Sequence, residues 1–132
     1  MSQPWSSVRV AGLALDVPAQ LVPLDEAAFE GSAAVLEGAG MRLTVDASPF
    51  ADPLTRYGAK PGFEHWQEPV GRATADFVVF EEEGTRTVAV TIHGRATAVV
   101  HQPAGAPKDV ALQILRSIRT DQIRTEQGET ND

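Results

Sequence analysis

The clearest hydrophobic pattern in the chain runs from Ala73 to His101, where apolar side chains occupy both of the alternating positions of a strand. Two turn signals, Glu83-Gly84 and Gly94-Arg95, divide this stretch into three segments rich in β-branched and aromatic residues. The pattern is typical of three antiparallel strands joined by tight turns. Because a sheet with two apolar faces needs a cover on each side, the two faces have to be considered separately.

The two turn signals predict a register for these strands. Centring the first turn on Glu83-Gly84 pairs Glu81 with Arg86, and centring the second on Gly94-Arg95 pairs Val90 with Val99. One face then carries the bulky side chains of Phe77, Val79, Val88, Val90, Ile92 and Val99. The other, which we call the second face, carries smaller and more polar side chains: Asp76, Val78, Phe80, Thr87, Ala89, Thr91, His93, Ala98 and Val100.

The end of the chain supplies a cover for the bulky face. Its apolar residues recur at helical spacing, and Pro107 suits the first position of a helix. The predicted apolar stripe consists of Val110, Ala111, Ile114, Leu115 and Ile118. We therefore expect this helix to pack on the bulky face.

Upstream of these strands, three segments have strand character. Val8–Val17 changes its alternation at Gly12, which predicts a bulge or tight bend there. The segments 33–37 and 41–47 flank Glu37–Gly40, whose glycines favour a hairpin turn. Together these patterns predict an α+β fold, with an antiparallel sheet of about six strands and the C-terminal helix on one face.

The second face has a less obvious cover. Ser48–Glu68 is broken by prolines and glycines and carries four large aromatic residues, namely Phe50, Tyr57, Phe63 and Trp66. We expect this excursion to form a loop and short-helix layer over the second face, or to present its aromatic residues to a partner. Residues 1–120 are predicted to form one domain, followed by a polar, disordered tail at 121–132.

Composition narrows the classes of function. Acidic residues outnumber basic ones 18 to 11, which gives a formal net charge of −7 and disfavours nucleic acids and membrane surfaces as partners. The absence of cysteine excludes disulfides and thiolate chemistry. The chain begins without a leader pattern and holds no apolar stretch long enough to cross a bilayer, so we predict a cytoplasmic protein.

Few residues suggest catalysis or cofactor binding. Asp76 and His93 are diagonal neighbours in the predicted register, close enough to form a general-base pair, but a structural hydrogen bond or the polar end of a strand is the more common reason for such a pair. The three histidines, His65, His93 and His101, lack the spacing of a compact metal motif. No glycine-rich loop leads from a strand into a helix, so we predict no cofactor and no metal.

The order of elements resembles one known superfamily. The resemblance is to the PsbP-like superfamily and rests on two segments. Ile114–Ile118, which follows the three predicted strands of 73–101, is similar to the closing helix of that superfamily, and Leu13–Pro18 is similar to its opening apolar strand followed by proline. That superfamily includes the photosystem II extrinsic protein PsbP, the yeast Ran-release factor and bacterial chaperones of type VI secretion effectors. The resemblance implies an antiparallel sheet between helical or loop layers and a non-catalytic binding role.

Three functional hypotheses remain open from the sequence. The first is a bacterial, adaptor-like or chaperone-like module that binds another protein, with self-association left open. Its predicted contact residues lie on the second face and in the excursion: Phe50, Tyr57, Phe63, Trp66, Val78, Phe80, Ala89, Thr91 and His93. The second is a small-molecule or lipid carrier with a cavity between the sheet and the C-terminal helix. The third is an enzyme that uses Asp76 and His93.

Overall fold

The computed structural model describes residues 4–10, 13–24, 33–38, 40–46, 60–70, 73–92 and 95–119. Within these ranges the chain forms nine strands and one helix. The strands are β1 (Trp5–Val10), β2 (Leu13–Pro18), β3 (Val22–Pro23), β4 (Ala33–Gly38), β5 (Met41–Asp46), β6 (Glu64–Val70), β7 (Ala73–Glu82), β8 (Thr85–Ile92) and β9 (Ala96–Pro103). The helix is α1 (Asp109–Arg116).

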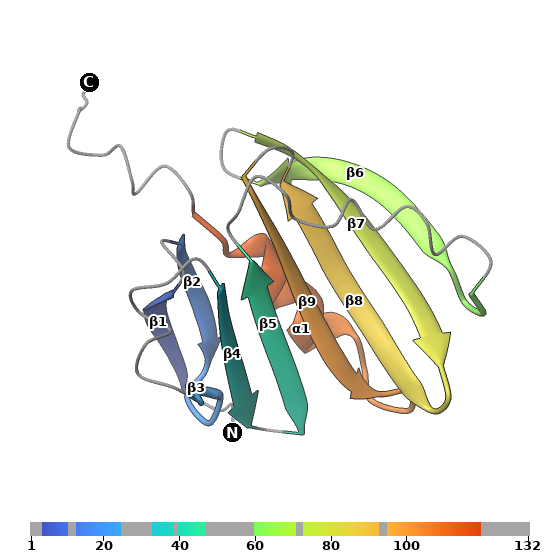
Figure 1. Ribbon diagram of the computed structural model, residues 1–132, viewed down its shortest axis with the longest axis horizontal. Helices are drawn as coiled ribbons and strands as arrows, with labels where there is room; N and C mark the ends of the chain where they lie inside the picture. Colours follow the sequence, from blue (N-terminus) through green and yellow to red (C-terminus); the bar gives the residue numbers. More distant parts are fainter. Residues whose placement is uncertain are drawn as a thin grey trace.

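The strands form two antiparallel sheets (Figure 1). β1 and β2 pair only with each other, and the remaining seven strands follow the order β3-β4-β5-β9-β8-β7-β6. The fold is therefore mostly antiparallel β-structure with one C-terminal helix, and its sheets are larger than the six strands predicted. The three extra strands come from the N-terminal segment, which forms a hairpin and not one bulged strand, from β3 and from β6.

One face of the seven-stranded sheet is covered by α1 and by the β1–β2 hairpin. Ile114 and Leu115 of α1 and Leu15 of β2 share one hydrophobic core with the inward-facing residues of β4, β5, β7, β8 and β9. Figure 1 shows α1 behind β5 and β9, so the second face of the sheet is turned toward the viewer. The prediction that the C-terminal helix covers the face of Phe77 and Val90 is confirmed.

The predicted register is exact at the first turn and wrong by one residue at the second. Glu81 pairs with Arg86, but Val90 pairs with Ala98 and not with Val99. Ile92 pairs with Ala96, so three residues connect the strands where a two-residue turn was predicted. Since a shift of one residue exchanges the two faces of a strand, Ala98 and Val100 belong to the core and Val99 to the second face.

The helix also differs from its predicted stripe at two positions. Ala111, Ile114, Leu115 and Ile118 are buried as expected, whereas Val110 is 37% exposed. Leu112, which is outside the predicted stripe, is buried at 8% exposure, so the buried face of α1 is turned toward Leu112 and away from Val110. This position exposes an apolar side chain at the start of α1.

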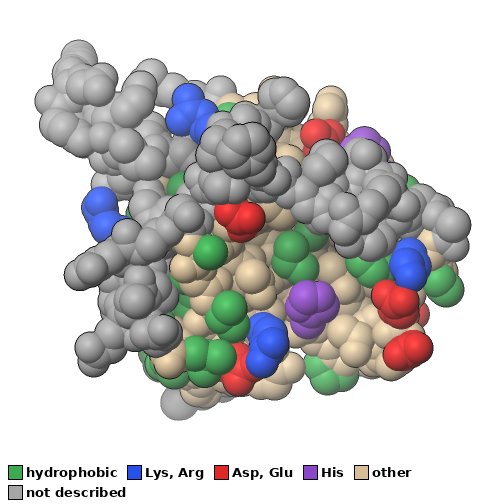
Figure 2. All heavy atoms as spheres, in the orientation of Figure 1, with side chains coloured by type: hydrophobic (Ala, Val, Ile, Leu, Met, Phe, Trp, Pro, Cys, Tyr) green, Lys and Arg blue, Asp and Glu red, His purple; other side chains and the backbone are tan. Residues whose placement is uncertain are grey.

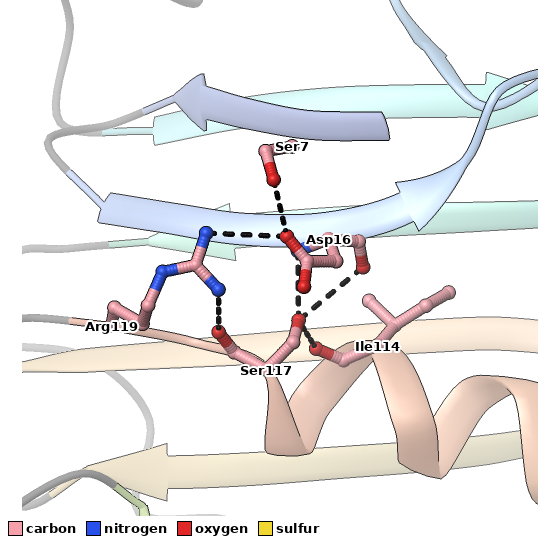
Figure 3. Close-up of polar contacts among 5 residues, drawn as sticks. All are labelled: Ser7, Asp16, Ile114, Ser117 and Arg119. Carbon is pink, nitrogen blue, oxygen red and sulfur yellow. Dashed lines mark hydrogen bonds and ion pairs between the residues drawn. The ribbon is translucent and has the colours of Figure 1, made fainter. Parts of the chain in front are cut away.

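A polar cluster joins the β1–β2 hairpin to the end of α1 (Figure 3). The backbone N–H of Asp16 donates to Ser117 Oγ at 2.8 Å, and Ser117 Oγ donates to the carbonyl oxygen of Ile114 at 2.6 Å. Ser7 Oγ and Arg119 Nη2 both donate to Asp16 Oδ1, at 2.7 and 3.2 Å. Ser7 and Arg119 therefore hold the pKa of the Asp16 carboxyl below its usual value.

Candidate functional site

The apolar centre of the second face, whose residues the sequence predicted as partner contacts, is buried. Val78 and Ala89 are 0% exposed and Phe80 is 5% exposed, and these three side chains form a separate small cluster. Phe63 and Val99 pack against this cluster. Thr91, predicted as a contact residue, is 8% exposed. Partner binding through these side chains would therefore need them to be uncovered first.

The surface on this side supports the same conclusion. Figure 2 shows the second face, where the described hydrophobic side chains appear as small separate areas among polar and charged ones. Three further residues predicted for the interface, Phe50, Tyr57 and His93, lie outside the described residues. So does most of the excursion, including its predicted short helix.

Trp66 lies on the opposite face from the one predicted. It belongs to β6, opposite Phe77, and the two rings stack with their centroids 5.5 Å apart. Its indole N–H donates to Glu68 Oε2 at 2.7 Å, and Arg116 of α1 bonds the same carboxylate at 3.0 Å. The segment predicted as irregular is here an edge strand, where charged residues and Pro69 are tolerated. Glu68 thus links β6 to α1 through Arg116, and Trp66 holds the same carboxylate.

The carboxylate of Asp76 contacts two side chains of the neighbouring strand. His65 Nε2 lies 3.1 Å from Asp76 Oδ1, and Gln67 Nε2 donates to the same oxygen at 2.9 Å. Thr91 lies opposite Asp76, which agrees with the register predicted from the pairing of Glu81 with Arg86. The predicted partner His93 is outside the described residues, so the Asp76–His93 pair stays a prediction.

A different site appears at the end of the sheet where β5 begins and β9 ends. The β5–β9 ladder stops at Arg42 and His101, so Met41 and Gln102 are not paired across it. A hollow of about 400 Å³ lies here, on the side of the sheet that α1 covers. Its lining is mostly apolar and includes Pro18, Met41, Gln102, Pro103, Pro107 and Val110. We call it the apolar hollow.

Gln102 is the unusual member of this lining. Its side chain is 4% exposed, and its Nε2 donates to the carbonyl oxygen of Pro107 at 3.3 Å. This bond shows that the NH₂ end of the Gln102 amide faces Pro107, because the carbonyl oxygen of Pro107 can accept a hydrogen bond only from a donor. Among the described residues nothing donates to Gln102 Oε1, and a buried acceptor without a partner costs about 1–3 kcal/mol.

A second hollow adjoins the first on the other side of the sheet. It measures about 540 Å³ and shares Gly40, Met41, Gln102 and Pro103 with the apolar hollow. We call it the polar hollow, because its lining also includes the ion pair of Glu37 and Arg42 and the side chain of His101. Burial, and then the nearby Arg42, lower the pKa of His101 below 6.5, which keeps this imidazole neutral at pH 7.

Sequence reasoning missed this site for a specific reason. In the predicted register, which is shifted by one residue in β9, Gln102 falls on the second face. A polar side chain is expected there, so nothing marked Gln102 as unusual. In the observed register it follows Ala96, Ala98 and Val100 on the face that α1 covers. A polar residue continuing a buried apolar series is the signal that the correct register would have revealed.

Two other possibilities receive no support from the described parts of the chain. No group of three or more His, Asp or Glu side chains in these ranges is placed to hold a metal ion. No helix in the same ranges is long and apolar enough to span a membrane.

The fold is similar at a distance to that of a solved structure. A crystal structure of a protein from Bacteroides thetaiotaomicron, at 1.50 Å resolution, has a TM-score of 0.52 and 12% sequence identity to this chain. The likeness covers 90% of this chain and 48% of the other, so this chain spans about half the length of that protein. No known protein family and no curated protein matches the sequence. The likeness concerns the fold alone, and the resemblance to the PsbP-like superfamily stays a prediction.

Proposed function

We propose that this protein is a non-catalytic binding protein for a small apolar molecule, which occupies the apolar hollow between the end of the sheet and α1. The observation that carries this proposal is the unpartnered, buried Oε1 of Gln102 in a mostly apolar lining. Ligand sites typically combine an apolar lining with a few placed polar groups, in volumes of about 300–1,000 Å³. The apolar hollow, at about 400 Å³, falls within that range.

The lining also explains why a ligand would gain stability there. Val110 leaves 37% of its surface in water, and Met41 is only partly buried. A ligand that covers these side chains removes apolar surface from water, which contributes about 25 cal/mol for each Å² buried. The prolines restrict the backbone around the hollow, so less conformational freedom is lost on binding.

Native mass spectrometry of the protein incubated with octanol tests this function. We expect a one-to-one complex for the natural sequence and its loss in Val110→Glu, because the new carboxylate would lie in the apolar lining. Gln113→Glu adds the same charge at an exposed position of α1 outside the lining and should still bind. Equal binding by all three proteins, or by none, would contradict the proposal.

A second candidate function is a protein-interaction module, and the exposed edge strand β3 favours it. Val22 of β3 and Leu24, which directly follows β3, are 51% and 56% exposed, and β3 forms the end of the seven-stranded sheet. An edge strand with apolar side chains can accept a strand from another protein. This surface replaces the second face as the place where we propose protein contact.

Site-specific crosslinking separates this candidate from the first. A photoreactive leucine analogue at Leu24 should capture one defined protein in cells, while the same group at Gln113 should not. Adducts that are identical at both positions, or absent at both, would count against protein recognition at β3.

A further inference from the structure

The two hollows meet at the end of the sheet, which restricts the shape of any ligand. They share Gly40, Met41, Gln102 and Pro103, and these residues lie just beyond the last pair of the β5–β9 ladder. The end of the ladder thus brings together an apolar volume on one side of the sheet and a polar volume on the other. In Figure 1 this place is the lower end of the sheet, where β5 begins and β9 ends.

The polar hollow offers hydrogen-bonding groups but little net charge. Arg42 Nε donates to Glu37 Oε2 at 2.6 Å, so the two opposite charges largely cancel. His101 is neutral at pH 7. The chain as a whole carries a formal charge of −7, which repels anions. A carboxylate or phosphate head group would therefore find no unpaired cation in the described lining.

Resting on the function proposed above, we infer that the ligand is an uncharged amphipathic molecule of the fatty-alcohol type. Its apolar chain lies in the apolar hollow, and its hydroxyl group donates to Gln102 Oε1 at the junction with the polar hollow. Access to this oxygen requires a neighbouring side chain to turn aside. Met41 lines both hollows and has a flexible, unbranched side chain, so it is suited to that movement.

A charged head group of either sign is disfavoured by desolvation. Bringing an ion to a nearly buried site is costly unless an opposite charge receives it. An ammonium group could donate to Gln102, but the nearby carboxylate of Glu37 is already paired with Arg42. An ether has the apolar chain and an acceptor oxygen but no donor, so it would leave Gln102 Oε1 unpartnered.

The test compares four probes with an eight-carbon chain by NMR titration of the ¹⁵N-labelled protein. Octanol should bind more tightly than octyl methyl ether by about two- to thirteen-fold, the net value of one hydrogen bond. Octanoate and octylammonium should bind more weakly than octanol at pH 7. The side-chain amide resonances of Gln102 should shift with octanol and less with the ether.

A Gln102→Met variant keeps the side-chain volume and removes the amide. If it folds, it should bind octanol and the ether equally; if it does not fold, the order of the four probes on the natural sequence decides. Tighter binding of octanoate or octylammonium than of octanol would overturn the head-group inference while leaving the proposed function intact. Failure of all four probes to bind would contradict the proposed function itself.

Discussion

At the scale of single residues, the β4–β5 hairpin shows why two neighbouring glycines have different roles. Gly38 and Gly40 both have positive φ, at +148° and +77°, as the glycine-containing turn signal predicted. A Cβ added to Gly38 would lie 1.8 Å from the carbonyl oxygen of Gln20, whereas one added to Gly40 would meet nothing within 4 Å. The first glycine therefore permits close backbone approach, and the second permits only an unusual conformation.

This difference gives a matched pair of substitutions. Gly40→Ala should lower the free energy of unfolding by about 1–2 kcal/mol, the cost of the left-handed conformation for a residue with a Cβ. Gly38→Ala should cost clearly more, because the backbone at Gln20 must also move. Urea unfolding of both variants measures this order, and equal losses would show that the close approach is not needed.

Single residues also show where sequence reasoning succeeds. The Glu83-Gly84 turn has φ values of +53° and +81°, as a two-residue hairpin turn requires, and this defined the register of β7 and β8 exactly. No comparable dipeptide defined the connection before β9, because Gly94-Arg95 is compatible with both two- and three-residue connections. Because of that one-residue uncertainty, the sequence did not show that Gln102 lies on the buried face of β9.

At the scale of elements, the packing of the β1–β2 hairpin on α1 depends on Ser117. Its hydroxyl group joins the backbone of Asp16 to the last turn of the helix, and the backbones of Ala14 and Arg119 bond to each other in both directions at 3.3 and 2.7 Å. Contacts between residues more than 100 positions apart have no signature in the local sequence pattern. For this reason the sequence did not predict that the hairpin shares a face of the sheet with α1.

Removing the hydroxyl group of Ser117 tests its role. Ser117→Ala should lower the free energy of unfolding by about 1–3 kcal/mol, because the partly buried N–H of Asp16 loses its acceptor. Ser7→Ala is the control, because Ser7 bonds only the exposed carboxylate of Asp16. Its substitution should lower the free energy of unfolding by less than Ser117→Ala does. Chemical denaturation followed by tryptophan fluorescence compares them, and a larger loss for Ser7→Ala would contradict this assignment.

The edge strand β6 was not predicted as a strand from the sequence. Charged residues, a histidine and Pro69 interrupt its apolar pattern, and only Trp66 and Val70 among its large side chains face the core. Its position is defined by pairing with β7 and by the contacts of Trp66 and Glu68 with Phe77 and Arg116. Those partners come from other parts of the chain, so the pattern within β6 alone could not reveal them.

At the scale of the whole molecule, three ionisable groups make stability depend on pH in the same direction. Arg116 and then Trp66 lower the pKa of Glu68 below 4.5, Ser7 and then Arg119 lower that of Asp16 below 3.8, and burial lowers that of His101 below 6.5. In each case the unfolded chain binds a proton at a pH where the folded chain does not. Stability therefore falls on acidification.

The histidine and the carboxylates act in separate windows, which makes this prediction testable. The free energy of unfolding should begin to fall as the pH drops through about 6.5, where His101 of the unfolded chain gains a proton, and should fall further below about 4.5 through Glu68 and Asp16. His101→Gln should remove the first decrease and leave the second. Urea unfolding across this pH range measures both, and an unchanged first decrease in the variant would contradict the role of His101.

The whole molecule also changes the functional picture that the sequence suggested. The second face, predicted as a partner surface, has its apolar centre buried at Val78 and Ala89, so a glutamate at either position would disturb folding. The cavity between sheet and helix, the alternative prediction, has a counterpart in the apolar hollow. Binding at the end of the sheet is thus the central claim.

Intermolecular nuclear Overhauser effects between bound octanol and the protein test that claim most directly. The account predicts contacts from the octyl chain to the methyl groups of Met41 and Val110, with the hydroxyl end near Gln102. Contacts confined to the second face, for example to Phe63 or Val99, or no intermolecular contacts at all, would contradict it.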